Sequence, residues 1–260
     1  MPEKHKYIKY FRPKISKNDW EEISRGDIIS PSRVLCNLFW KKLNYTYIRE
    51  ELGAINVLDT GCGDGSYALK LNEYWKGIDS YLGIDNIYNK KWDYLKKQYE
   101  FINFSRTSYL NIDKSIPQKT NIFISQSAIE HFHYDLEYFS KINDFIKYNK
   151  KNIIQIHLFP SPACLWLYLF HGFRQYNLRS ILKIIDIFKS SNSYFRLYLL
   201  GGDYSNKLHL KAITIPHFIF RKIFRLNKNK YLKDLEKSFL KDQIISSKNP
   251  SFYALIIHSN

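Results

Sequence analysis

The feature that most limits the fold is a regular alternation of short apolar runs with helical segments between residues 55 and 158. Runs rich in Ile, Val, Leu, Tyr and Phe predict five strands, at residues 55–59, 81–85, 101–105, 121–125 and 152–158. The segments between them predict helices at 66–75, 89–99 and 134–148. Parallel strands need crossover connections, which helices supply. The order therefore predicts an α/β protein with a doubly wound, mostly parallel sheet.

The pattern changes after residue 158. Residues 194–200 and 251–258 predict a sixth and a seventh strand, the seventh antiparallel to its neighbours. The sheet should thus have seven strands, with lid insertions at about 159–190 and 203–248, after strands five and six. Within the first insertion, residues 178–189 have apolar residues at helical spacing, and residues 207–241 of the second are mostly helical in pattern.

The first fifty residues are basic and helical in pattern. Asn18 and Asp19 can cap a short helix at 20–24, and Ser30-Pro31-Ser32 can open a longer one that runs through Glu51. We expect residues 1–52 to form a helical cap and residues 53–260 to form one Rossmann-like domain with its insertions. A chain of 260 residues is long enough to bury one core of this kind.

The net charge of +16 and the isoelectric point near 9.5 favour anionic partners such as nucleic acid, a phosphorylated substrate or an acidic membrane surface. A second explanation is genome composition, since Lys, Asn, Ile, Tyr and Phe are abundant together and the basic residues are spread along the chain. The sequence leaves both explanations open.

Cysteine and histidine usage predicts neither a disulfide framework nor a metal site. Cys36, Cys62 and Cys164 are odd in number and lack CxxC spacing, and His133, His171, His209 and His217 are spread without metal-ligand spacing. The first residues have no apolar signal-peptide core, and no run reaches the ~18 apolar residues that cross a bilayer. These patterns predict a cytoplasmic setting.

The residues with the clearest chemical signal follow the first predicted strand. The sequence Val57-Leu58-Asp59-Thr60-Gly61-Cys62-Gly63-Asp64-Gly65 places glycines at every second position between a strand and a helix. Glycines there let the backbone approach a ligand closely. A dinucleotide site has GxGxxG spacing and holds a pyrophosphate, whereas GxGxG after an acid suits a cofactor with a cationic end.

This pattern resembles the first motif of class I S-adenosylmethionine-dependent methyltransferases, and the likeness extends over residues 55–158. The resemblance implies that S-adenosyl-L-methionine is the cofactor and that Asp59, Gly61, Cys62 and Gly63 line it. The alternative is a glycine turn with no ligand.

Asp85 closes the second predicted strand, at the position of the family's second motif. A carboxylate there can accept both hydroxyls of a ribose, and Asn86 or Ile87 would then flank the adenine. The alternative is an exposed Asp that caps a helix. Ser108 and Tyr109 follow strand three, where relatives place a polar residue near the adenine; this chain departs from their usual form, so ordinary loop residues are an equal interpretation.

Strand four leads into Ser125-Gln126-Ser127-Ala128-Ile129-Glu130-His131, which is similar to the corresponding segment of small-molecule methyltransferases. Gln126 and Ser127 would border the methyl group. No proline follows Ser125, which counts against methylation of a base amino group, and no cysteine nucleophile for cytosine C5 is present there.

His131 and His157 are the candidate general bases, because each follows or ends a strand at the edge where such sheets bind ligands. The alternative for each is a structural role. The aromatic residues 160–176, with His171 and Arg174, would form a substrate wall for a sugar or nucleotide-linked acceptor; a helical hairpin over the sheet or a homodimer contact is the competing interpretation.

The sequence therefore predicts an enzyme that methylates oxygen on a small or carrier-linked acceptor. A loose resemblance to methyltransferases of surface-polysaccharide gene clusters implies a sugar hydroxyl or a phosphate-derived group as the acceptor. An RNA methyltransferase is the alternative, favoured by charge but not by motif. A non-catalytic protein that keeps the fold for binding is a third interpretation.

Overall fold

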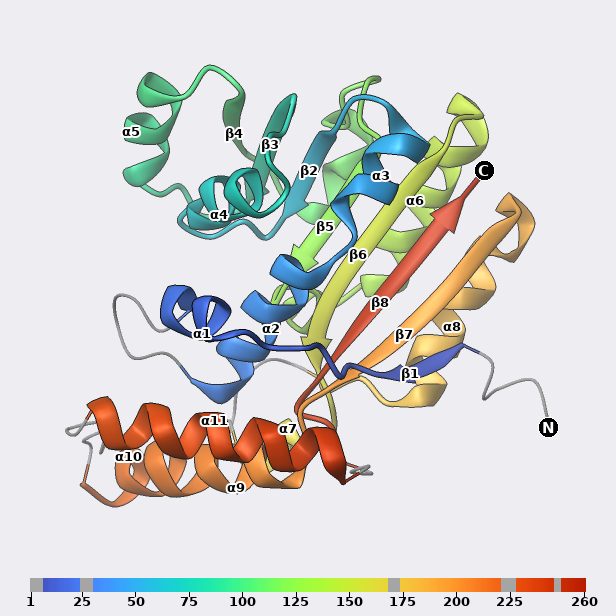
Figure 1. The fold of residues 1–260 in the computed structure, drawn as a ribbon. Coiled ribbons are helices and arrows are strands. Elements are labelled where there is room, and N and C mark those ends of the chain that lie inside the picture. Colours follow the sequence, from blue (N-terminus) through green and yellow to red (C-terminus); the bar gives the residue numbers. More distant parts are fainter. Residues whose placement is uncertain (1–6, 24–29, 168–173, 221–227, 246–248) are drawn as a thin grey trace. The chain divides into compact units, whose positions relative to one another are not determined.

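The computed structural model describes residues 7–23, 30–167, 174–220, 228–245 and 249–260 (Figure 1). Its strands are β1 (Ile8–Tyr10), β2 (Asn56–Thr60), β3 (Ser80–Asp85), β4 (Ile102–Arg106), β5 (Ile122–Gln126), β6 (Ile153–Pro160), β7 (Ser193–Leu200) and β8 (Phe252–Ser259). Its α-helices are α1 (Lys17–Ile23), α2 (Pro31–Lys42), α3 (Tyr45–Leu52), α4 (Ser66–Tyr74), α5 (Lys91–Gln98), α6 (Asp135–Asn149), α7 (Cys164–Leu167), α8 (Leu178–Phe188), α9 (Asp203–His209), α10 (Ile215–Phe220) and α11 (Lys228–Ile244).

The strands hydrogen-bond in the order β1-β7-β8-β6-β5-β2-β3-β4. β2 pairs in parallel with β3 and β5, β3 with β4, and β5 with β6, whereas Figure 1 shows β8 running opposite to β6. The prediction of an α/β fold with a mostly parallel, doubly wound sheet is confirmed. The strand number was wrong: the described residues hold eight strands, because the segment predicted as helical also contains β1, which pairs with β7 and forms one edge of the sheet.

The chain divides into two compact units. The first comprises Met1–Lys42, Pro160–Gln175 and Leu197–Ala254, and the second comprises Leu43–Phe159, Tyr176–Arg196 and Leu255–Asn260. We call them the helical unit and the sheet unit.

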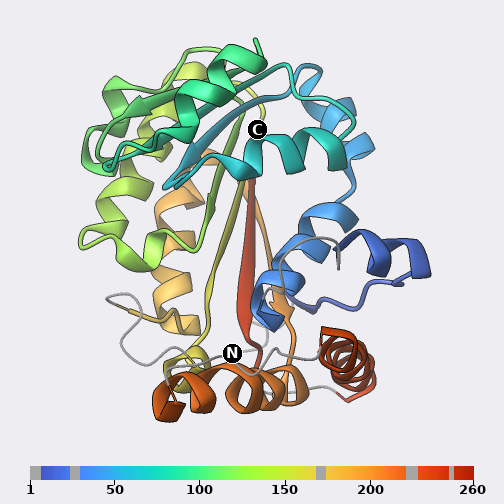
Figure 2. The same cartoon turned by 90° about the vertical axis from the view of Figure 1, so that its left-hand side faces the viewer.

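In the sheet unit, buried strands are covered by helices on both faces. All five residues of β2 are buried, as expected of a central parallel strand. Figure 2 shows α6 and α8 on one face of the sheet and α3 and α4 on the other. The predicted helix over 30–51 is in fact two helices, because Asn44 caps a new one by accepting from the Tyr47 amide at 3.2 Å.

In the helical unit, α1 begins with a reciprocal cap. The Asp19 amide donates to Ser16 Oγ at 3.1 Å, and the Ser16 amide donates to Asp19 Oδ2 at 2.7 Å, so the predicted capping Asp works from inside the helix. Aromatic rings form its core: Phe11 packs edge-on against Phe39 at 5.4 Å, and Trp20 against Phe239 at 5.8 Å.

The aromatic segment predicted as a substrate wall is described only at its ends. Residues 168–173, which include His171, lie outside the described residues. Tyr176 is buried in the sheet unit, where its hydroxyl donates to Asp135 Oδ2 at 2.7 Å and its ring contacts Phe159. That end of the segment is therefore part of the core.

Candidate functional site

The glycine loop joins the end of β2 to the start of α4. Gly61 lies in the left-handed region at φ +77°, and a Cβ added there would come within 2.4 Å of Ala128 Cβ. Gly63 also has a left-handed φ of +57°, but a Cβ there would meet nothing within 4 Å. Glycine at 61 thus permits close packing against the segment after β5, whereas glycine at 63 leaves open space at the loop surface.

Asp85 lies against this loop. Its Oδ2 accepts the Gly63 amide at 3.0 Å, and its Oδ1 accepts the Ile87 amide at 3.1 Å. β2 and β3 are parallel neighbours with Asp59 paired to Gly83, so their carboxyl ends, and the loops that follow, meet at one edge of the sheet. The structure therefore brings together the two sequence motifs from which the cofactor site was predicted.

Side chains from α5 hold the loop from outside. The Trp92 indole donates to the Gly63 carbonyl at 2.9 Å, and its ring stacks on Phe104 with centroids 5.2 Å apart. Lys91 Nζ lies 3.0 Å from Asp64 Oδ2. Burial raises the pKa of Asp64. Hydrogen bonds from Ser66 and the nearby Lys91 ammonium together outweigh this effect, so the pKa lies below its ordinary value. Asp64 is thus already paired with a cation.

Asp59 is buried, with only 4% of its surface exposed. The Tyr81 hydroxyl donates to its Oδ2 at 2.5 Å. Burial raises the pKa of Asp59 to about 7, while the Tyr81 hydrogen bond lowers it and the Asp85 charge raises it. The Asp59 carboxyl group is therefore buried beneath the glycine loop and does not lie on its exposed surface.

The Cys62 side chain points away from the exposed face of the glycine loop, so only the backbone of this residue is part of that face. The side chain is buried, and a Cβ added to Gly83 would come within 2.8 Å of Cys62 Sγ, so the sulfur packs beneath the loop. Its amide donates to the Ile84 carbonyl at 3.2 Å. Burial raises the pKa of the thiol, which keeps it neutral.

The residues after β3 are open to solvent. Asn86 is exposed, and its carbonyl accepts from Arg106 Nε at 3.2 Å. Ile87 is 71% exposed. An exposed apolar side chain beside Asp85 can pack against a flat ring, as predicted for Ile87 and the adenine.

Ser108 and Tyr109 are engaged with the protein itself. Ser108 Oγ accepts from the Leu110 amide at 3.3 Å and so caps the 3₁₀ turn Tyr109–Lys114. Tyr109 stacks on Phe132, with ring centroids 4.0 Å apart and planes 5° apart. This stack joins the segments that follow β4 and β5.

Gln126 is the last residue of β5 and Ser127 follows it, and both are half-buried. Gln126 Nε2 donates to the Tyr67 hydroxyl in the first turn of α4. Ser127 has a left-handed φ of +50°, and its amide donates to the Leu158 carbonyl at 2.9 Å. The structure thus links these residues to both the helix after the glycine loop and β6.

His131 and His157 lie in different surroundings. His131 is exposed on the 3₁₀ turn Ile129–His131, five residues beyond Gln126. His157 is fully buried within β6, because the strand continues to Pro160 rather than ending at residue 158. Its Nδ1 lies 2.8 Å from Ser125 Oγ and its Nε2 3.3 Å from Gln155 Oε1.

Burial also lowers the pKa of His157 to about 3. A base must reach a substrate proton, and both ring nitrogens of His157 are already occupied inside the core. These observations argue against the catalytic role predicted for His157.

Sequence reasoning missed Tyr67, Tyr81 and Trp92 as parts of this site. Each supports a predicted residue through a contact far along the chain, to Gln126, Asp59 and Gly63 respectively. The one available signal was position, since Tyr67 lies in the first turn after the glycine loop, next to any ligand bound there. No group of three His, Cys, Asp or Glu side chains placed to hold a metal ion occurs in the described part of the chain.

No protein-family model and no curated protein matches the sequence. Solved structures do match. The plantazolicin methyltransferase BamL, solved with a triazolic desmethylPZN analog and SAH, is 18% identical with a TM-score of 0.55; the match covers 94% of this chain and 90% of that chain. Magnesium protoporphyrin IX methyltransferase from Synechocystis PCC 6803, with bound SAH, is 13% identical with a TM-score of 0.52, covering 94% of each chain.

A SAM-dependent methyltransferase from Archaeoglobus fulgidus is 19% identical, with a TM-score of 0.50 and coverage of 92% of this chain and 98% of that chain. At such low identity these matches bear on the fold. The glycine loop and the acid after the next strand are the elements on which the sequence resemblance to the same class was based. The chain therefore has the Rossmann-like fold of the class I S-adenosylmethionine-dependent methyltransferases.

Proposed function

We propose that the protein is a methyltransferase that uses S-adenosyl-L-methionine. The observation that carries this proposal is the Asp85 carboxylate, which lies 3.0 Å from the Gly63 amide while remaining partly exposed beside the open face of Gly63 and the exposed Ile87. That arrangement offers a hydroxyl acceptor, an uncrowded backbone and an apolar surface within one short stretch of the sheet edge. Ribose, methionine and adenine need these three features.

The cofactor would supply an electrophilic methyl group on a positively charged sulfur. The residues proposed to hold it are Asp59, Gly61, Cys62, Gly63, Asp85 and Asn86, with Gln126 and Ser127 at the reacting end. Asp85 would accept ribose hydroxyls, and the buried Asp59 would favour positive charge above the loop. Ser108 and Tyr109 would shape the adenine side, since their own bonds fix the segment after β4.

Calorimetric titration with S-adenosylmethionine and with its demethylated product tests the cofactor. Asp85→Ala should lower the affinity for each of the two compounds by at least ~100-fold, because two charge-assisted hydrogen bonds are lost and the Gly63 amide loses its acceptor. Asp186→Ala, which removes an exposed carboxylate of α8 in the same unit, is the matched control and should change nothing. Absence of binding by the unmodified protein would refute the proposal.

For the reaction itself, we propose O-methylation of a small or carrier-linked acceptor. Two of the neighbours support a small acceptor, since BamL was solved with a triazolic desmethylPZN analog and the Synechocystis enzyme is named for magnesium protoporphyrin IX. A sugar hydroxyl or phosphate-derived group in surface-polysaccharide synthesis rests on the sequence resemblance alone. A screen of nucleotide-activated sugars, phosphorylated precursors and RNA would identify the acceptor class.

His131 is the residue we propose as general base. It is exposed and follows Gln126 and Ser127, which would border the methyl group, and transfer to a hydroxyl needs only orientation and a proton acceptor. With an acceptor in hand, His131→Gln should lower kcat by about 10²- to 10⁴-fold and leave cofactor affinity unchanged. If kcat at its pH optimum is unaffected, another group takes the proton, and the assignment of the cofactor site stands independently.

A further inference from the structure

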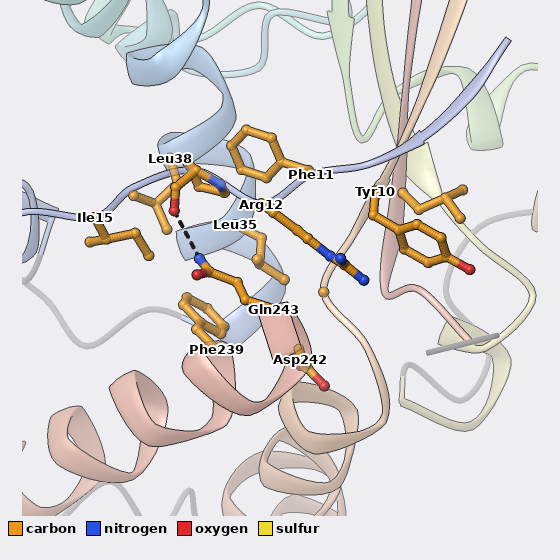
Figure 3. Close-up of a pocket in the computed structure, with 12 residues that line it drawn as sticks. Tyr10, Phe11, Arg12, Ile15, Leu35, Leu38, Phe239, Asp242 and Gln243 are labelled. Atoms are coloured by element: carbon orange, nitrogen blue, oxygen red, sulfur yellow. Dashed lines mark hydrogen bonds between the residues drawn. The ribbon is translucent and has the colours of Figure 1, made fainter. Parts of the chain in front are cut away.

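The helical unit contains a lysine-lined groove between the α9–α10 segment and α11. Five lysines line it, against one acid, Asp234; the lysines are Lys207, Lys211, Lys230, Lys237 and Lys241. Its volume is about 490 Å³, whereas the pocket of Figure 3, beside Arg12 and Gln243, holds about 20 Å³. The latter is the size of one or two water molecules, so of these two the groove is the one that can receive a larger ligand.

Hydrogen bonds between α9 and α11 hold the lysines of the two sides of the groove close to each other. Figures 1 and 2 show α11 beside α9, and the Asp242 carboxylate of α11 accepts the amides of Tyr204 and Ser205 at 2.9 Å each. Lys207 and Lys241, from opposite helices, lie 5.7 and 5.1 Å from the centroid of the same Tyr204 ring. Two ammonium groups held over one ring concentrate positive charge that an anion would relieve.

The same helix exposes a row of large apolar side chains. α9 continues through the π-helical turn Leu210–Thr214 into α10, where Ile215, Phe218 and Ile219 are 44%, 73% and 61% exposed. These three positions have the i, i+3, i+4 spacing of one helix face. Side chains of this size on a water-facing surface mark a contact with another apolar phase or partner.

The lysines and the apolar row lie along one line of the helix. Lys207, Lys211, Ile215 and Ile219 follow one another at intervals of four, and all are exposed. In an α-helix this interval drifts around the axis, because one turn takes 3.6 residues. The wider π turn between Lys211 and Ile215 offsets that drift. On α11, Lys237 and Lys241 likewise alternate with the exposed Leu240 and Ile244.

We propose that this surface binds the face of a bilayer that contains anionic phospholipids. The lysines of the groove contact headgroup phosphates, and Ile215, Phe218 and Ile219 enter the boundary between headgroups and acyl chains. No described helix is long and apolar enough to cross a bilayer. The surface belongs to the helical unit, so the inference does not depend on the proposed methyl transfer.

RNA is the other polyanion that lysines could attract, and the groove fits it less well. Single-stranded nucleic acid is usually held by stacking on exposed aromatic rings and by arginine. Among the residues that the structure describes, those that line the groove include no arginine, and most of the exposed apolar residues beside them are aliphatic. Aliphatic side chains neither stack on a base nor hydrogen-bond to a phosphate, but burial among acyl chains removes them from water and is favourable.

Flotation of the full-length protein with phosphatidylcholine vesicles, with and without about one third phosphatidylglycerol, tests the proposal. We expect binding only to the anionic vesicles, weakening as salt rises. Lys207→Gln/Lys211→Gln should lower affinity about 30-fold, at about 1 kcal/mol for each lysine and 1.4 kcal/mol for each factor of ten. Phe218→Ser/Ile219→Ser should lower it by at least about tenfold.

Matched controls lie in the sheet unit. Lys96→Gln/Lys97→Gln removes the same charge from exposed positions of α5, and Tyr148→Ser removes an 83% exposed aromatic residue from α6; neither should change vesicle binding. Ile219→Cys can carry an environment-sensitive fluorophore, because Cys36, Cys62 and Cys164 are buried. Its emission should shift to the blue on anionic vesicles.

Three outcomes would overturn the proposal. One is the absence of binding to the anionic vesicles. Another is vesicle binding that the Phe218→Ser/Ile219→Ser change leaves intact, which would mean that the lysines attract the anionic headgroups but that the apolar side chains do not enter the bilayer. The third is binding of an RNA oligonucleotide, abolished by the lysine change, under conditions in which vesicles are not bound.

Discussion

Two neighbouring regions at the same edge of the sheet unit differ in how they are built. After β2 and β3, backbone amides and glycines face an open surface, and Asp85 is held by the amides of Gly63 and Ile87. Within β5 and β6, side chains bond to one another inside the core, as Ser125 and Gln155 do with His157. The first region has space at its surface, as the proposed cofactor site requires, whereas the second fills the interior.

The difference shows why position at a strand end does not by itself identify a site residue. Ser125 and His157 are register partners on β5 and β6, and both side chains point into the sheet's covering layer, where Phe139 of α6 packs against the imidazole at 5.0 Å. One residue further along, the β5 side chain is the half-buried Gln126. Alternation along a strand therefore decides which of two adjacent polar residues can reach a ligand.

The sharpest test of the comparison uses the two glycines of the open region. Gly61→Ala should destabilise the fold by about 3 kcal/mol, because the new Cβ adds a clash with Ala128 to the cost of a left-handed residue. Gly63→Ala carries only the left-handed cost, about 1 to 2 kcal/mol, since its Cβ meets nothing within 4 Å. Urea unfolding of both variants measures the difference.

Cofactor titration of the same pair separates folding from binding. Gly63→Ala puts a methyl group into the open face of the loop, so it should bind S-adenosylmethionine much more weakly than its modest loss of stability would explain. Equal stability of the two variants would show that the loop does not pack on Ala128 as described. Unchanged cofactor affinity in Gly63→Ala would remove the open face from the proposed site.

The buried region makes a prediction about acid. The folded-state pKa of His157 is about 3, below the ordinary 6.5, so the unfolded chain takes up a proton below pH 6.5 while the folded chain does not. Stability contributed by the neutral imidazole is therefore present above pH 6.5 and lost as pH falls towards 3. Between pH 7 and pH 5 the loss should be about 2 kcal/mol.

Urea unfolding at the two pH values, with His157→Gln as the variant, measures this loss. The variant should lose about 2 kcal/mol less than the unmodified protein over the same interval, whatever its absolute stability. An identical pH dependence in the His157 variant would mean that the imidazole is accessible after all, and would restore it as a candidate base.

Much of the sheet could be predicted from the sequence, because buried parallel strands require continuous β-branched and apolar runs, as at Asn56–Thr60. The glycine loop and Asp85 could be predicted for a similar reason: backbone geometry restricts residue type there. Contacts between side chains distant in sequence could not, since Tyr81 and Tyr67 leave no local pattern that indicates Asp59 or Gln126. β1 was missed because three residues are too few for a period-two signal to stand out from a basic helical segment.

The smallest predicted effect concerns Asp59, a buried acid of the open region. Its carboxyl group has a pKa of about 7, so at pH 6 it is mostly neutral, and at pH 8 mostly ionised. A positively charged cofactor above the loop favours the ionised form, and its binding should therefore lower this pKa and release a proton. Affinity for S-adenosylmethionine should rise about tenfold between pH 6 and pH 8 and level off above.

Calorimetric titration across this interval, in buffers of different ionisation enthalpy, measures both the affinity and the proton released. The cofactor also titrates near neutral pH, so Asp59→Asn is measured alongside: its amide can still accept from Tyr81 but cannot ionise, and the difference between the two proteins isolates the carboxyl group. A pH dependence shared by both proteins would mean that the sulfonium does not sense Asp59. In that case the acid that precedes the glycines would serve to orient Tyr81 and β2, and the carboxylate of Asp85 alone would act on the cofactor.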